Sequence, residues 1–173
     1  MTFFERSNRV TSPYGYREIT VNGRLQKETH RGHDVVPTNY AGEQVPESAW
    51  NVREVTGGTV KRIGYDRSRG NYVDIATEPG VFERYQHLAK ILVQVGQKVA
   101  QGAVIAVAGS TGNSTARHLH FGVYRGGSAE WNAIEPSAWD GLPNKAGIYS
   151  GDNTVDGSAT PPVPAPTPTQ ANR

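Results

Sequence analysis

Glycines interrupt the second half of the chain every few residues, and between them apolar residues alternate with polar ones. The clearest run is residues 82–124, FERYQHLAKILVQVGQKVAQGAVIAVAGSTGNSTARHLHFGVY, where Gly96, Gly102, Gly109 and Gly112 separate short pieces. A period of two predicts strands, because successive side chains of a strand point to opposite faces. With 20 glycines and 11 prolines in 173 residues, the sequence predicts an all-β domain rather than long helices.

The distribution of apolar residues predicts one domain followed by a tail. Residues 57–66 and 70–78 both alternate, and we expect them to pair as a hairpin. Residues 38–53 are expected to form a loop, and a short helical turn is expected near Pro136. Residues 151–173 hold five of the 11 prolines and almost no large apolar residue. We therefore expect a domain over 1–150 and a disordered, polyproline-like linker or tail over 151–173.

Composition excludes several classes of protein. The formal charge is +2, from 18 basic and 16 acidic side chains, which is too balanced for a nucleic-acid-binding protein. The chain has no cysteine, so any metal must use nitrogen and oxygen ligands. No stretch has the length and hydrophobicity of a membrane span, and the N-terminus MTFFERSNRVTSPYG lacks the apolar core of a secretory signal.

The segment ARHLHFGVY places two of the five histidines one residue apart beside strand-forming residues. Alternation predicts that Leu119, Phe121 and Val123 face the core, while His118 and His120 share the other face. By themselves, these two histidines are also compatible with an ordinary exposed strand face.

A second cluster, HRGHDVV, places His30 and Asp34 four residues apart with Gly32 between them. The even spacing predicts that both side chains lie on one face of a strand. With His120 they give two imidazoles and one carboxylate, which suit zinc and leave a fourth position for water. A surface hydrogen-bonded pair is the alternative for His30 and Asp34 alone.

Three further histidines need an interpretation. His118 and His87, the latter in RYQHLAK, are candidates for the proton transfers of amide hydrolysis, because imidazole titrates near neutral pH. His33 has an odd offset from both His30 and Asp34. We therefore expect it on the opposite side as a packing or surface residue, not as a fourth ligand.

These motifs resemble those of a known family. HRGHD resembles the H-x-G-x-D signature, and HLHF the H-x-H signature, of the lysostaphin/LytM-type zinc peptidases of family M23. SPYGYR, GGTV, GNYVDI, YQHL, the run from VQVGQK to HLHF, and IEP are also similar in order and spacing, so the resemblance covers roughly residues 11–140.

The resemblance implies a zinc endopeptidase, a hydrolase that cuts cross-links or stem peptides of bacterial peptidoglycan and so degrades the cell wall. It implies that His30, Asp34 and His120 bind Zn²⁺ and that His118 and His87 are catalytic. It also implies an antiparallel β-sheet or sandwich, the duplicated hybrid motif of this family, with a narrow groove walled by loops.

Further expectations concern setting and partners. The enzyme is expected to act at the bacterial wall, outside the cell or in the periplasm, as a monomer. The absence of a signal peptide suits an antimicrobial bacteriophage endolysin or prophage lysin, with a wall-binding or virion domain after the linker. Loops such as 38–53 and 125–133 are expected to set which bond is cut.

Two other classes of function compete with this interpretation. The run VQVGQKVAQGAVIAVAG resembles the β-hammerhead of biotinyl and lipoyl carriers, but no lysine stands at the turn that such carriers modify. A catalytically silent module of the same fold, which binds peptidoglycan or regulates another wall hydrolase, is the second alternative. Such a module is expected to have lost a zinc ligand, and this chain keeps the whole set.

Overall fold

The computed structural model of the protein describes residues 3–4, 7–21, 23–38 and 46–150. The expected tail over 151–173 and residues 39–45 of the expected loop lie outside the described residues. The strands are β1 (Ser7–Ser12), β2 (Gly15–Val21), β3 (Arg24–His30), β4 (His33–Pro37), β5 (Asn51–Arg53), β6 (Gly58–Asp66), β7 (Gly70–Glu78), β8 (Val81–Ile91), β9 (Lys98–Val99), β10 (Val104–Ala108), β11 (Leu119–Arg125), β12 (Ala133–Ile134) and β13 (Gly147–Ser150). The helical turns are η1 (Glu47–Trp50), η2 (Glu130–Asn132) and α1 (Ser137–Asp140).

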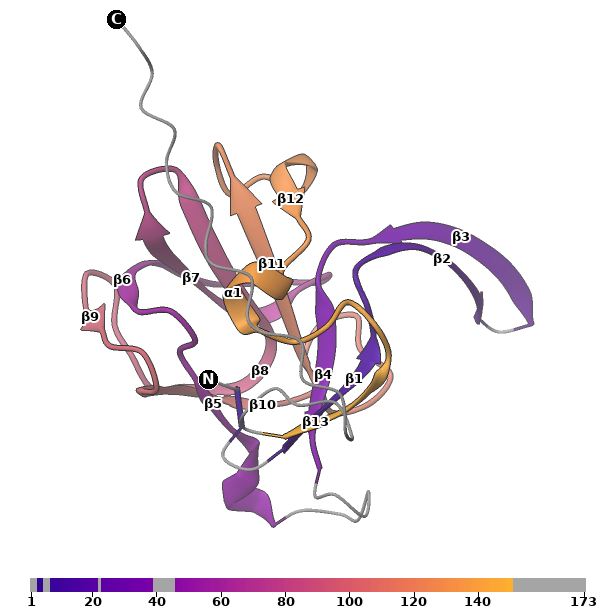
Figure 1. Ribbon diagram of the computed structural model, residues 1–173, viewed down its shortest axis with the longest axis horizontal. Helices are drawn as coiled ribbons and strands as arrows, with labels where there is room; N and C mark the ends of the chain where they lie inside the picture. Colours follow the sequence, from indigo (N-terminus) through magenta and orange to yellow (C-terminus); the bar gives the residue numbers. More distant parts are fainter. Residues whose placement is uncertain (1–2, 5–6, 22, 39–45, 151–173) are drawn as a thin grey trace, which may run out of the picture.

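Antiparallel pairing joins almost all of these strands into one twisted sheet (Figure 1). Its order is β13-β1-β4-β11-β8-β7-β6-β9, with β10 paired to β5 and β8, and β12 paired to β11. Strands β4, β11 and β8 are therefore neighbours near the middle, although β4 and β11 are far apart in the sequence. This confirms the all-β prediction, and the helical turn expected near Pro136 is α1.

The expected hairpin over 57–66 and 70–78 is β6 and β7, which pair from Thr59 with Ala76 to Asp66 with Gly70. The Asp66 side chain closes the turn, because its Oδ1 accepts hydrogen bonds from the backbone nitrogens of Ser68 (2.9 Å) and Arg69 (2.8 Å). Gly70 has φ 64°, a left-handed conformation that glycine adopts without steric cost.

The core lies on the inner face of the sheet. Leu119, Phe121 and Val123 of β11 are all 0% exposed, which confirms the alternation predicted for this strand. The Phe121 ring packs against Phe3 at 4.7 Å and Tyr85 at 5.1 Å between centroids. Burial of such side chains stabilises the fold by about 1.5–3 kcal/mol each.

The mostly polar residues before His30 form a strand of their own, separate from β4. β2 and β3 make a separate two-stranded ribbon, paired from Gly15 with His30 to Val21 with Arg24, which extends away from the main sheet (Figure 1). Cross-strand ion pairs such as Lys27 with Glu18, 3.1 Å apart, support a ribbon that has few apolar contacts.

The prediction of a continuous loop over residues 38–53 is wrong at its end. Glu47–Trp50 form η1, and Asn51–Arg53 form β5, which pairs with β10. Val52 and Val55 enter the core, and this burial overrides the weak local signal. No helix in the described part of the chain is long and apolar enough to cross a membrane.

Candidate functional site

His30 and Asp34 do not lie on one strand, contrary to the sequence interpretation. β3 ends at His30 and β4 begins at His33, so the chain turns at Arg31 and Gly32. The two side chains meet because this turn brings the end of the ribbon against the start of β4. Asp34 is the direct cross-strand partner of His120 on β11, and their side chains therefore share one face of the sheet.

Gly32 allows this turn to lie against β11. A Cβ atom at this position would be 2.2 Å from the carbonyl oxygen of Phe121 and 2.7 Å from Nε2 of His120. Any larger residue would therefore displace the His120 ring or the backbone of β11. Glycine at this position therefore makes room for a neighbouring side chain and strand.

Three ligand atoms converge at this point. Nε2 of His30 is 3.1 Å from Oδ1 of Asp34, Nδ1 of His120 is 2.9 Å from the same oxygen, and the two nitrogens are 3.1 Å apart. Among the described residues, these three form the group of acidic, histidine or cysteine side chains that could hold a metal ion. The expected ligand set is thus brought together.

Hydrogen bonding indicates that a cation fits between these atoms. Nδ1 of His30 lies 2.8 Å from the carbonyl oxygen of Pro13, an arrangement that assigns the ring proton to Nδ1 and leaves Nε2 with a lone pair. That lone pair faces the Asp34 carboxylate. Two nitrogens and one oxygen are a zinc ligand set that leaves a fourth coordination position for water.

Asp34 remains ionised in this setting. Burial alone would raise the pKa of its carboxyl group, but hydrogen bonds from His118, His120 and His30 outweigh burial and hold the pKa far below its ordinary value. The carboxylate charge is therefore present at neutral pH.

His118 lies next to the three candidate ligands but is not one of them. Its Nδ1 is 2.8 Å from the carbonyl oxygen of Ala116, and its Nε2 is 3.5 Å from Oδ1 of Asp34. Burial lowers the pKa of His118, but the hydrogen bond and the charge of Asp34 outweigh it and raise the pKa above its ordinary value. The ring is available for proton transfer next to the ligand atoms.

His87 reaches the same space through a β-bulge. Gln86 and His87 of β8 together oppose the single residue Tyr72 of β7, because the register shifts between Asn71 and Val73. Among the described non-glycine residues, His87 alone has a positive φ, 61°. Such a conformation costs about 1–3 kcal/mol and is retained where the surrounding structure enforces it.

The bulge turns His87 toward the other histidines. Its ring centroid is 4.7 Å from that of His118 and 6.0 Å from that of His120, and its Nδ1 is 2.8 Å from the carbonyl oxygen of Thr111. Burial, together with the neighbouring histidines, lowers the pKa of His87 to about 4. The His87 ring is therefore neutral at pH 7, and it lies beside the rings of His118 and His120.

His33 lies outside the cluster, as its odd offset predicts. It is fully buried, with Nδ1 2.7 Å from Oδ2 of Asp140 and Nε2 3.1 Å from Oδ1 of Asn144. It is a packing residue that joins β4 to the segment around α1.

Arg17, the last residue of SPYGYR, also lies at the site. Its Nη1 lies 3.6 Å from Oδ2 of Asp34, and Glu28 and Ser12 hold its guanidinium group. Sequence reasoning missed Glu28 and Ser12. An Asn-Gly dipeptide at positions 22 and 23 is a sequence signal for a two-residue hairpin connection, and this signal predicts Arg17 opposite Glu28, as the strand register shows.

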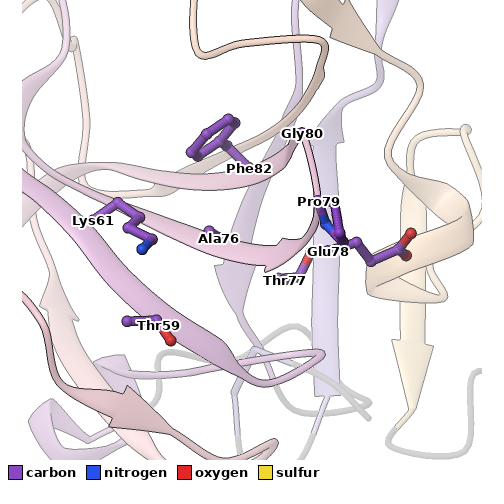
Figure 2. A pocket seen from close by; sticks show the side chains of 8 residues that line it. All are labelled: Thr59, Lys61, Ala76, Thr77, Glu78, Pro79, Gly80 and Phe82. Carbon is purple, nitrogen blue, oxygen red and sulfur yellow. The ribbon is translucent and has the colours of Figure 1, made fainter.

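An open depression of about 460 Å³ lies away from the histidines, on β6, β7, β8 and the turn between the last two (Figure 2). Its charged lining groups are Lys61 and Glu78, and it contains no histidine. The chemistry of the molecule therefore does not centre on this depression.

Comparisons with known proteins show which family the chain is similar to. The family model "Peptidase family M23" matches residues 29–133. The peptidoglycan DD-endopeptidase ShyC of Vibrio cholerae is 33% identical over 114 residues, which are 65% of this chain and 24% of ShyC. The chain thus spans about a quarter of the length of this curated relative.

Two solved structures are similar over most of the domain. The catalytic domain of the antimicrobial peptidase lysostaphin from Staphylococcus simulans is 27% identical, with a TM-score of 0.58 over 77% of this chain and 89% of that one. A zinc-containing peptidase from Vibrio cholerae is 32% identical, with a TM-score of 0.58 over 75% of this chain and 36% of that one. They confirm the lysostaphin-type fold.

Proposed function

Because the chain belongs to peptidase family M23, we propose that it is a zinc-dependent endopeptidase that hydrolyses peptide bonds of bacterial peptidoglycan. The observation that carries this proposal is the convergence of His30 Nε2, Asp34 Oδ1 and His120 Nδ1, with two further histidines beside them. Three ligands with a free fourth position are typical of a catalytic metal site rather than a structural one.

His30, Asp34 and His120 would hold the zinc ion. When bound, zinc lowers the pKa of its water toward about 7 and polarises a carbonyl group. The Asp34 carboxylate supplies one negative charge to offset the cation. The carbonyl oxygen of Pro13 keeps the His30 proton on Nδ1, so that Nε2 is free to act as the ligand.

The other two histidines are assigned the proton transfers and the stabilisation of charge. We assign His118 as the general base, because its Nδ1 is held by a backbone carbonyl and its Nε2 faces the ligand atoms. We assign His87 to the stabilisation of the tetrahedral intermediate. Because Thr111 holds one ring proton on Nδ1 and the resting ring is neutral, this role requires Nε2 to take up a second proton as negative charge develops beside it. The centroids of the two rings are 4.7 Å apart, so that a proton taken up by one ring lowers the proton affinity of the other.

A catalytically silent module is the second candidate function, and the site does not favour it. Such a module has no need to hold His87 in a strained backbone conformation beside an intact ligand set. Retention of both features favours turnover.

Further parts of the proposal concern the protein's setting. We propose that the protein acts at the bacterial cell wall as a monomer. We also propose that its domain ends near residue 150, where a linker begins, and that a wall-binding or virion domain follows the linker. An origin as a bacteriophage endolysin with antimicrobial action is likewise a proposal, as are the narrow loop-walled groove and the effect of residues 125–133 on bond choice.

The test is digestion of purified peptidoglycans that differ in cross-link, one with direct D-alanyl cross-links and one with polyglycine bridges. Each is incubated with the protein, with the protein plus a chelator, and with the chelated protein after zinc is restored. Mass spectrometry of the released fragments identifies the bond. We expect release that the chelator abolishes and zinc restores. If both walls stayed intact while the protein held one zinc ion, the silent-module alternative would replace this proposal.

A further inference from the structure

The two oxygens of the Asp34 carboxylate have different surroundings. Oδ1 faces nitrogens of His30, His120 and His118, at 3.1, 2.9 and 3.5 Å. Oδ2 instead faces Nη1 of Arg17, at 3.6 Å. Arg17 lies on β2 of the ribbon, which is not part of the main sheet that carries Asp34.

The Arg17 guanidinium group is held from two sides. Nε and Nη2 contact Oε1 of Glu28, at 2.7 and 2.5 Å, and Nη1 donates a hydrogen bond to Oγ of Ser12 at 2.6 Å. Glu28 is the direct cross-strand partner of Arg17 in the ribbon. Because its donors are engaged in this way, the side chain has a defined position although 28% of it is exposed.

The charge of Arg17 requires compensation at this position. An uncompensated cation next to Asp34 would reduce the attraction of the carboxylate for a metal ion. Glu28 supplies the opposite charge in direct contact with the guanidinium group. The pair can therefore orient Asp34 without a net positive charge beside the site.

We infer that Arg17 is a positioning residue that engages Oδ2 of Asp34, so that Oδ1 alone is presented to the metal and the fourth coordination position stays open. The inference rests on the metal site of the proposed function. Lysine cannot replace Arg17, because one ammonium group cannot contact Glu28, Ser12 and Asp34 in the fixed geometry of a guanidinium fork.

The test is the zinc affinity of the protein, measured by competition with a chromogenic chelator. The variants are Arg17→Gln and Arg17→Lys, with Lys27→Gln as the matched control. Lys27 forms the neighbouring cross-strand ion pair of the same ribbon, with Glu18, and both side chains are well exposed. We expect Arg17→Gln to weaken zinc binding about 10-fold or more, Arg17→Lys to restore little of it, and Lys27→Gln to leave it unchanged.

Co²⁺ bound in place of zinc gives a second measurement that a purely structural role would not change. Its visible absorption weakens as the coordination number rises, so we expect a weaker band for Arg17→Gln if both Asp34 oxygens then bind. Equal affinity and an equal spectrum for the wild type and Arg17→Gln would overturn the inference, as would an equal loss in Lys27→Gln. If the wild type bound no zinc, the proposed function would fail as well. If the wild type bound zinc and the Arg17 variants bound it equally well, only this inference would be refuted.

Discussion

Three of the four clustered histidines, those at positions 30, 87 and 118, place Nδ1 against a backbone carbonyl oxygen. This contact fixes the tautomer and turns Nε2 toward the centre of the cluster. His120 differs, because it presents Nδ1 to Asp34. The carbonyl partners of the first three are Pro13, Thr111 and Ala116. The hydrogen-bond partner of Nδ1 thus determines which nitrogen each ring presents to the cluster.

At this scale, substitutions of His118 and His120 should separate zinc binding from turnover. His120→Ala removes a ligand atom and should lose both zinc and activity. His118→Ala leaves the three ligand atoms in place, so zinc should be retained while the rate of wall hydrolysis falls by about 10²–10⁴-fold. Metal content and fragment release measured on the same preparations check this. A His118→Ala variant with a near-normal rate would overturn the assignment of His118.

Strand β8 contributes both to the site and to the core, because it carries His87 at the site and Glu83 in the core. Glu83 and Glu54, the residue after β5, are both 0% exposed. Hydroxyl groups of Thr56 and Tyr85 donate hydrogen bonds to Glu83. Burial first, and then the nearby Glu54 carboxyl group, raise the pKa of Glu83 well above its ordinary value. Folded protein therefore keeps a proton on Glu83 at pH values where the unfolded chain has lost it.

This raised pKa makes stability depend on pH with a definite sign. Below about pH 4.5, Glu83 is protonated in both states, so its full contribution is present. As pH rises toward the raised folded pKa, the unfolded state alone loses the proton, and the free energy of unfolding falls by up to about 1.4 kcal/mol per pH unit. Glu83→Gln should remove this decline, because an amide does not titrate.

Urea denaturation of the wild type and Glu83→Gln at pH 5 and pH 8 measures this effect. Glu78→Gln is the matched control, since Glu78 lies on the neighbouring strand β7 and is exposed. We expect the control to follow the wild type and Glu83→Gln to lose less stability between the two pH values. Parallel behaviour of all three proteins would contradict the raised pKa.

Over the whole molecule, the metal site joins parts that the chain order keeps apart. His30 ends the ribbon, Asp34 lies on β4, and His120 lies on β11, 90 residues after His30. The ligand atoms can therefore converge only in the folded state. A metal that binds the folded state alone stabilises it by mass action.

Thermal denaturation with and without zinc should show this coupling. Free zinc at 100 times its dissociation constant adds about 2.7 kcal/mol, which corresponds to a rise in Tm of roughly 5–10 °C for a domain of this size. His30→Ala should lack the rise, whereas His33→Asn should still show it, because His33 is not a ligand. Equal Tm values for the wild type with and without zinc would show that this site does not bind zinc in solution.

Much of this architecture follows from the sequence, because period-two alternation and turn residues act over a few positions. The β6–β7 hairpin, the inward face of β11 and the direction of His33 away from the ligand cluster follow from such local patterns. The ribbon was missed although its Asn22–Gly23 turn signal is present, because its strands are mostly polar.

The sequence by itself determined the all-β class and the chemical identity of the site: histidine nitrogen and carboxylate oxygen, with no thiolate to compete. Only the tertiary structure decided how these groups meet. The turn at Gly32, the bulge at His87 and the contact of Arg17 with Asp34 depend on how strands β2, β3, β4, β7, β8 and β11 pair and pack. Local patterns fix which face a side chain takes, whereas contact between distant segments is set by strand order and register.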